Sequence, residues 1–167
     1  MLNRIARFTH VSREQFEQDW QETFSSPTPA FPPLPVRATA GSAGYDFASP
    51  LSFTLKPGET VKIPTGIRAE MEPGWVLLVF PRSSLGFKYR LQLNNTVGVI
   101  DADYAFAKNE GHIFLKLTND SNDNKTLEVP AGMAIAQGIF LPFGITEDDC
   151  ADAVRTGGIG STTKNGK

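Results

Sequence analysis

The chain has 167 residues, of which 40% are hydrophobic and 20% charged, a composition typical of one globular domain with a buried core. Its 16 basic and 18 acidic side chains leave a formal net charge of -2, which gives no support for non-specific binding to nucleic acid or to a membrane surface. The single cysteine, Cys150, excludes a disulfide within the chain and favours a reducing, cytoplasmic setting.

An amphipathic helix is predicted near the start of the chain. Ser12 is a suitable N-cap, and Gln15 three residues later completes a capping box. Aromatic side chains then recur every four residues at Phe16, Trp20 and Phe24, which gives the helix one apolar stripe. We expect the stripe to dock on the domain or on a neighbouring subunit, and the sharper alternative is a helix that binds another protein.

Short strands are predicted for most of the chain that follows. Prolines concentrated between residues 25 and 36 indicate an extended connector, and Gly- and Pro-containing turns then separate short apolar runs. The run 75–80 is apolar throughout, which fits a strand covered on both faces. The other expected strands cover residues 53–55, 61–63, 67–71, 113–117, 127–129 and 135–141. The pattern indicates an all-β barrel or sandwich, with a jelly-roll-like form preferred because many short strands need closure.

Three parts of the chain are distinguished by composition. We expect an N-terminal helix and connector at 1–35, a β domain at 36–154 and a glycine-rich tail at 155–167. Composition alone favours a disordered tail without a role.

Four segments carry groups suited to nucleotide chemistry. A small-residue loop ends in Asp46, while Arg82 follows a predicted buried strand together with two serines, a combination suited to phosphate. Asp101 offers a carboxylate base, and Arg155 heads the glycine-rich tail. Each feature also has a structural interpretation, since Asp46 could cap a turn, Arg82 could pair with Asp101, and Asp101 and Asp103 could be solvated turn residues.

Five segments in order, namely 40–46, 81–86, 95–104, 132–137 and 155–162, resemble the motifs of the trimeric dUTP diphosphatase (dUTPase) family. The form is similar to that of enzymes from Gram-positive bacteria and their phages. The resemblance implies a jelly-roll-like dUTPase β-barrel or sandwich with a short N-terminal helix and a flexible C-terminal tail. It also implies Mg²⁺-dependent hydrolysis of dUTP to dUMP and pyrophosphate, a reaction that limits uracil in DNA and supplies dUMP for thymidylate synthesis.

The resemblance assigns roles position by position. Asp101 would be the general base that polarises the attacking water, and Asp46 would contact Mg²⁺ through water. The phosphates would be bound by Arg82, Ser83, Ser84, Gln137, Arg155, Gly158, Ser161 and Thr162. The nucleoside would be bound by Asn95, Gly98, Val99, Tyr104 and Ile159. Sites would be shared between the subunits of a homotrimer, and the tail would close over the substrate.

Two departures from the family pattern stand out. Ile159 occupies the place of an aromatic residue that usually stacks on uracil, and Phe106 and Phe87 are the candidates to replace this contact. The stretch 105–111 is longer than the short link that usually follows the tyrosine of the third motif.

Two further functions are considered. A dCTP deaminase shares the fold, but Lys116 stands where those enzymes carry a glutamate base, and Phe87 where they usually carry a second arginine. A dUTPase-fold regulator that engages a protein partner stays open because of the predicted N-terminal helix and Ile159. His10 and His112 fit no catalytic triad and are interpreted as structural or surface residues.

Overall fold

The computed structural model describes residues 3–153, 155 and 157. In chain order the elements are β1 (Ala6–His10), α1 (Arg13–Thr23), β2 (Val36–Arg37), β3 (Tyr45–Ala48), β4 (Phe53–Leu55), β5 (Thr60–Pro64), β6 (Ile67–Met71), β7 (Trp75–Pro81), α2 (Ser83–Tyr89), β8 (Leu91–Leu93), β9 (Gly98–Asp101), the 3₁₀ helix η1 (Ala102–Phe106), β10 (Phe114–Asn119), β11 (Leu127–Val129) and β12 (Ala134–Pro142). Short antiparallel strands dominate, so the all-β prediction is confirmed.

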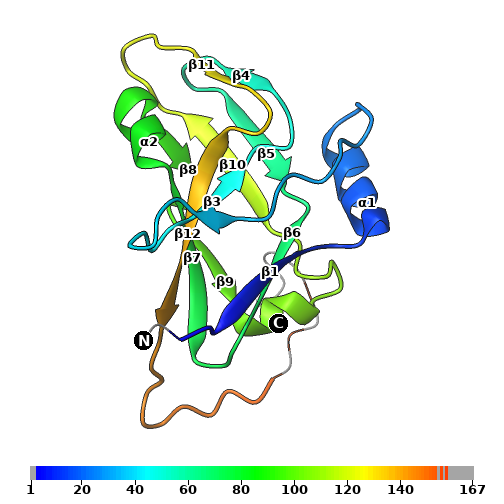
Figure 1. Cartoon of the computed structure of the whole chain (residues 1–167), viewed down its shortest axis with the longest axis vertical. Helices are drawn as coiled ribbons and strands as arrows, with labels where there is room; N and C mark the ends of the chain where they lie inside the picture. The colour runs from blue at the N-terminus through cyan, green and yellow to red at the C-terminus, as the bar shows by residue number, and fades with distance from the viewer. Residues whose placement is uncertain (1–2, 154, 156, 158–167) are drawn as a thin grey trace, which may run out of the picture.

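The strands form four small sheets around one core (Figure 1). The largest sheet has the order β2-β3-β12-β7-β9, and a second sheet has the order β5-β10-β8. The pairs β1-β6 and β11-β4 complete the arrangement. Strands distant in sequence lie side by side, and their inward-facing apolar side chains share one buried cluster, as expected for a jelly-roll-like fold.

Strand β7 runs through the middle of the largest sheet, between β12 and β9. Leu77 and Val79 are fully buried on one face, whereas Val76, Leu78 and Phe80 are only partly covered. The prediction that this run is buried on both faces is therefore wrong for a single chain. Pairing along both edges explains the apolar run, because a central strand tolerates β-branched and large apolar residues on either face.

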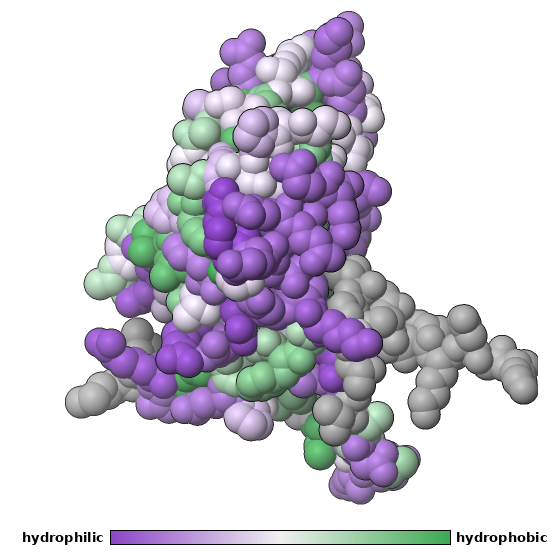
Figure 2. All heavy atoms as spheres, turned by 90° about the vertical axis from the view of Figure 1, so that its right-hand side faces the viewer, coloured by the Kyte–Doolittle hydropathy of each residue, from purple (hydrophilic) through white to green (hydrophobic). Residues whose placement is uncertain are grey.

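Helix α1 packs on the domain through the predicted stripe. Phe16 and Trp20 are at most 2% exposed and cluster with the partly buried Phe24 and Phe31. Figure 2 faces the side that carries α1, and hydrophilic residues dominate the centre of this face. The stripe is thus used inside the chain, which removes it as the surface for a separate protein partner.

Only one of the two hydrogen bonds of the predicted capping box forms at the start of α1. The Ser12 hydroxyl accepts a hydrogen bond from the Gln15 N–H at 3.1 Å, as an N-cap should. The reciprocal bond of a capping box is absent from Gln15, because the Ser12 N–H donates to the carboxylate of Glu110 at 2.7 Å instead. The start of the helix is therefore fixed by a residue from a distant loop.

Several elements were not predicted individually, among them β1, α2 and η1. β1 pairs along its whole length with β6, from Ala6 opposite Met71 to His10 opposite Ile67, and thus joins the N-terminal segment to the barrel. Across the described part of the chain, no helix is long and apolar enough to cross a membrane.

Replacing Phe16 by Ala should lower the free energy of unfolding by about 3–5 kcal/mol, because the ring is fully buried and its removal leaves a cavity. Urea denaturation measures this change. Gln18→Ala, on the exposed face of the same helix, is the control and should change the value by less than about 0.5 kcal/mol. Equal effects of the two substitutions would contradict the docking of α1 on its own domain.

Candidate active site

The first group of predicted site residues lies where three neighbouring strands of the largest sheet meet α2. Register places Asp46 of β3 and Phe80 of β7 on either side of Gln137 in β12. Arg82 follows the end of β7, and its guanidinium forms an ion pair with the Asp46 carboxylate. We call Asp46, Arg82, Ser83, Ser84 and Gln137 the Arg82 cluster.

The Arg82 cluster is accessible and preorganised. The Asp46 and Arg82 side chains are 24% and 32% exposed, and both serines are exposed at the first turn of α2. Gln137 donates to the carbonyl of Pro81 at 3.2 Å. A Cβ on Gly44 would lie 2.7 Å from the Gln137 amide oxygen, so a larger residue there would displace this amide. Arg82 pairs with Asp46 and Asp101 pairs with Arg155, so the structural alternative in which Arg82 pairs with Asp101 is wrong.

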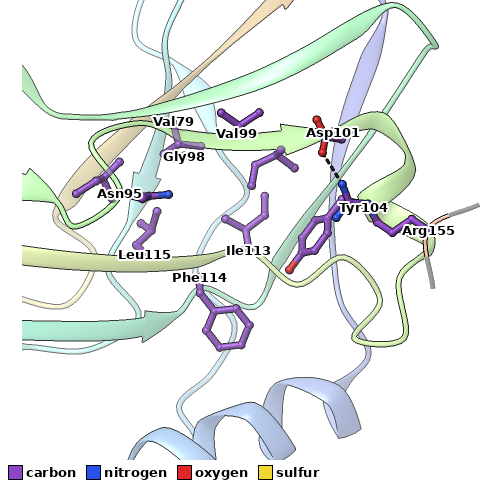
Figure 3. A pocket seen from close by; sticks show the side chains of 12 residues that line it. Val79, Asn95, Gly98, Val99, Asp101, Tyr104, Ile113, Phe114, Leu115 and Arg155 are labelled. Carbon is purple, nitrogen blue, oxygen red and sulfur yellow. Dashed lines mark hydrogen bonds and ion pairs between the residues drawn. The ribbon is translucent and has the colours of Figure 1, made fainter. Parts of the chain in front are cut away.

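The second group lines a pocket between the hairpin 94–97, β9, η1 and β10 (Figure 3). We call this cavity the hairpin pocket. Its polar lining comes from Asn95, Asp101, Tyr104 and Arg155, and its apolar lining from Val79, Leu93, Gly98, Val99, Ile100, Ile113, Phe114 and Leu115. A hollow that combines apolar walls with a few polar groups suits a small planar ligand.

The hairpin that carries Asn95 is held in a strained shape. Thr96 has a φ of 67°, a left-handed conformation that costs a β-branched residue of order 1–3 kcal/mol. Its N–H donates to the Leu93 carbonyl at 2.9 Å, and the Val97 N–H donates to the Asn95 carbonyl at 2.7 Å. A strained backbone that is held by such hydrogen bonds fits a loop whose shape serves to recognise the polar edge of a ligand.

Tyr104 forms a fixed wall of the hairpin pocket. It is 5% exposed, and its hydroxyl donates to the His112 carbonyl at 2.7 Å and accepts from Asn109 at 2.9 Å. Burial raises the pKa of this hydroxyl above its ordinary value, although the bond from Asn109 acts in the opposite direction. The phenol therefore stays protonated and keeps its bond to His112.

Arg155 is bound to the two acids beside the pocket. Its Nη2 lies 2.5 Å from the Asp101 carboxylate (Figure 3), and its Nε lies 2.8 Å from Asp103. The guanidinium also lies 5.7 Å from the centre of the Tyr104 ring. The predicted base and the predicted phosphate clamp thus contact each other in the single chain.

The Arg82 cluster and Asp101 are separated along the sheet. Asp101 pairs with Val76 at the start of β7, whereas Arg82 follows the end of that strand. Six residues of extended chain span about 20 Å. Gly98 pairs with Val79, nearer to Arg82, so a ligand that runs from Gly98 past Tyr104 to Asp101 points away from the Arg82 cluster of its own chain.

A buried hydrogen bond between Asp19 and His112, behind the pocket, was missed by the sequence reasoning. His112 is fully buried, and its Nδ1 lies 2.5 Å from Asp19 of α1 while its Nε2 accepts the N–H of Gly66 at 2.7 Å. Burial lowers the pKa of His112 below its ordinary value, although Asp19 acts in the opposite direction. Both ring nitrogens are occupied, so the interpretation of His112 as structural holds, but no local pattern pointed to Asp19.

The remaining predicted residues Gly158, Ile159, Ser161 and Thr162 lie outside the described residues. Val99 is 59% exposed at the rim of the pocket, and Phe87 and Phe106 are 91% and 79% exposed. Among residues 3–153, 155 and 157, no group of three or more acidic, His or Cys side chains forms a metal cage. Asp46 offers one carboxylate, which suits contact with Mg²⁺ through its retained water.

Comparison with known proteins gives a consistent result. The profile of the family described as dUTPase matches residues 32–163. The deoxyuridine 5'-triphosphate nucleotidohydrolase of Lactococcus lactis subsp. lactis is 42% identical over 132 residues, which cover 77% of this chain and 87% of that protein. The corresponding protein of Hahella chejuensis is 40% identical over 138 residues, covering 78% and 86%.

Two solved structures are similar to this chain. The crystal structure of dUTPase from Streptococcus mutans aligns with a TM-score of 0.62 at 35% identity, over 84% of this chain and 98% of that one. A Staphylococcus bacteriophage 80alpha dUTPase aligns with a TM-score of 0.64 over 90% of each chain, and at 20% identity this likeness concerns the fold alone. Both cover more of this chain than the sequence relatives do.

The burial of His112 predicts a pH dependence of stability. Because the folded protein holds the imidazole neutral and its pKa is lowered from 6.5, the unfolded chain binds more protons as the pH falls below that value. The free energy of unfolding should therefore decrease from about pH 7 to about pH 5.5, by at most about 1.4 kcal/mol per pH unit. Urea titrations at several pH values measure the slope. His112→Gln should remove this contribution, and an unchanged slope in the variant would contradict the assignment.

Proposed function

The chain belongs to the dUTPase family, and on this premise we propose that it hydrolyses dUTP to dUMP and pyrophosphate. The observation that carries the proposal is the hairpin pocket, which has the Asp101 carboxylate beside it and the tyrosine wall of Tyr104 between that acid and the hairpin. A base, a sugar and a reacting phosphate need these three surfaces in that order.

Asp101 is the proposed general base. Its side chain is 50% exposed, so water reaches it, and it lies at the end of β9 where the backbone is held by pairing with Val76. The water oxygen attacks the α-phosphorus while its proton passes to Asp101. The bond from the α-phosphorus to the bridging oxygen breaks, and pyrophosphate leaves with that electron pair.

The Arg82 cluster is proposed to bind the phosphates. Arg82 supplies a fixed cation, while Ser83, Ser84 and Gln137 supply neutral hydrogen-bond donors for phosphate oxygens. Mg²⁺ chelated by the triphosphate would neutralise charge that develops on the leaving pyrophosphate. Asp46, at the centre of the cluster, fits as an acceptor for the water that this ion retains.

The hairpin pocket is proposed to select the nucleoside. Asn95 and the backbone near Gly98 offer both a donor and acceptors to the polar edge of uracil, and a base with the wrong pattern leaves them unpaired. The tight hairpin would leave no room for the thymine methyl. Tyr104 packs under the deoxyribose and leaves no polar partner for a 2'-hydroxyl.

The positions of the two groups support a homotrimer with shared sites. Phosphates of a nucleotide in the hairpin pocket lie at Asp101 or beyond it, about 20 Å along β7 from the Arg82 of the same chain. A neighbouring copy related by a rotation can bring its own Arg82 cluster to this place, as in a closed ring of heterologous contacts. The half-covered face of β7 offers apolar surface for such contacts.

Arg155 and the glycine-rich residues after it are proposed to act as a lid over the phosphates. The guanidinium now occupies an oxygen of Asp101, so it must leave before water can use that oxygen. The triphosphate provides a stronger anionic partner for the guanidinium. A cytoplasmic location and a regulatory protein partner are the remaining expectations. The aromatic stripe of α1 no longer supports such a partner, because it packs on its own domain.

Replacing Asp101 by Asn should lower kcat for dUTP by at least about a hundredfold, because the amide cannot accept the proton of the attacking water. Pyrophosphate release with Mg²⁺ measures the rate, and calorimetry should show that dUTP still binds. Asp103→Asn is the matched control, since it lies two residues away and also contacts Arg155. Equal losses in the two variants would mean that Asp101 has no special role.

Mixing two inactive variants tests the shared site. Asp101→Asn lacks the base and Arg82→Ala lacks the phosphate cation, and each should be inactive alone. After joint refolding, random assortment should restore about one quarter of wild-type activity, because one site in four would combine both intact residues. Failure to regain activity in proven mixed trimers would refute a site built from two chains.

A further inference from the structure

Helix α1 is joined to the hairpin pocket by two sets of polar contacts. Both sets reach the segment 107–112, which lies between η1 and β10. One set comes from Asp19 in the middle of the helix and the other from Ser12 at its N-cap. The family profile matches residues 32–163, so helix α1 lies outside the matched region, whereas its partners Glu110 and His112 lie within it.

The first contact fixes the protonation of His112. A backbone N–H can only donate, so the bond from Gly66 requires an unprotonated Nε2 on the imidazole. Nδ1 therefore carries the proton and donates it to Asp19 at 2.5 Å. Asp19 is 8% exposed and also accepts from Gln15 at 2.9 Å, so its carboxylate is held in place from the helix side.

The second contact fixes the loop from its other end. Ser12 donates to Glu110 through its N–H at 2.7 Å and through its hydroxyl at 2.6 Å. These two bonds lower the pKa of Glu110 below its ordinary value, so the group stays a carboxylate. Helix α1 and the loop are thus hydrogen-bonded at two residues of the loop, Glu110 and His112, which lie on either side of Gly111.

The hydrogen-bonded segment 110–112 determines the position of Tyr104. The Tyr104 hydroxyl donates to the carbonyl of His112, the residue whose ring Asp19 holds. Gly111 approaches so closely that a Cβ there would lie 2.7 Å from the Tyr104 carbonyl oxygen. Figure 3 shows α1 below the pocket, on the side to which the hydroxyl of Tyr104 points.

We propose that Asp19 is a positioning residue for the nucleoside, acting through His112 on Tyr104. The proposal rests on the proposed function, since Tyr104 is the surface against which the sugar packs there. The apolar stripe is sufficient to pack α1 on the domain. The buried carboxylate of Asp19 adds little to stability over an apolar residue of similar size. Its directional bond instead orients the His112 ring and the carbonyl that receives the Tyr104 hydroxyl.

The test compares steady-state hydrolysis of dUTP and UTP by the full-length protein and by Asp19→Ala, Asp19→Asn and Gln18→Ala. In Asp19→Ala the Nδ1–H of His112 loses its acceptor, and we expect KM for dUTP to rise about tenfold, with a smaller change in kcat. The preference for dUTP over UTP should fall by a similar factor. Asp19→Asn keeps an acceptor oxygen and should return KM to within about twofold of wild type, while Gln18→Ala should match wild type.

A helix with only a stabilising role gives a different result. Asp19→Ala would then melt at a lower temperature but keep the wild-type KM and the wild-type preference for dUTP, and this outcome would overturn the proposal. If Asp19→Ala does not fold, Glu110→Ala is used instead, because it removes the hydrogen bonds with Ser12 at a half-buried site. KM for dUTP and the preference for dUTP over UTP are again the two readouts.

The failure of the proposed function would be seen separately. Wild-type protein without dUTP turnover would refute the proposed activity while leaving the positioning role to be tested by calorimetry with dUMP and UMP. Weaker binding of dUMP and a reduced preference over UMP in Asp19→Ala would support that role. Unchanged affinities for both nucleotides would overturn it.

Discussion

The antiparallel pairing of β7 with β12 on one side and β9 on the other determines where each functional side chain lies. Through β12 the strand brings Gln137 and Asp46 to the turn that carries Arg82. Through β9 it places Asp101 near its opposite end. Because hydrogen-bonded register admits no gradual sliding, a shift by one residue would turn every side chain to the other face. Strand β7 therefore positions both the Arg82 cluster and Asp101, and it keeps these two groups too far apart to contact the same phosphate within one chain.

A second constraint centres on Gly66, where the appended helix meets the barrel. Its carbonyl accepts the Val11 N–H at 3.1 Å, and its own N–H donates to His112. A φ of 70° suits glycine, and a Cβ would lie 2.9 Å from the Phe31 ring. Packing by Phe16 and Phe31 excludes water from this junction, which strengthens the polar bonds inside it. The N-terminal segment and the pocket wall consequently share one rigid support.

Local sequence patterns predicted the elements but not the long-range partners. Period-two alternation and Gly-containing turns identified most strands, and the spacing of Phe16 and Trp20 identified the helix, because these signals need only neighbours in sequence. β1 has no strong pattern of its own and is a strand because β6 lies beside it. The Asp19–His112 and Ser12–Glu110 pairs span 93 and 98 residues, so only the folded chain reveals them. For the site, motif order indicated which residues matter, whereas the register of β7 shows that they form two separate groups.

The contact of Arg155 with Asp101 links these two groups to the tail. Two carboxylates at positions 101 and 103 repel each other, and a forked guanidinium between them satisfies both while covering an edge of Tyr104. The same contact occupies one oxygen of the carboxylate that is proposed to activate water. A triphosphate carries more negative charge than the two acids together, so its arrival at Asp101 favours transfer of the guanidinium from carboxylate to phosphate. If Asp101 and the tail act as proposed, binding of the phosphates and release of this carboxylate oxygen by the guanidinium become one event.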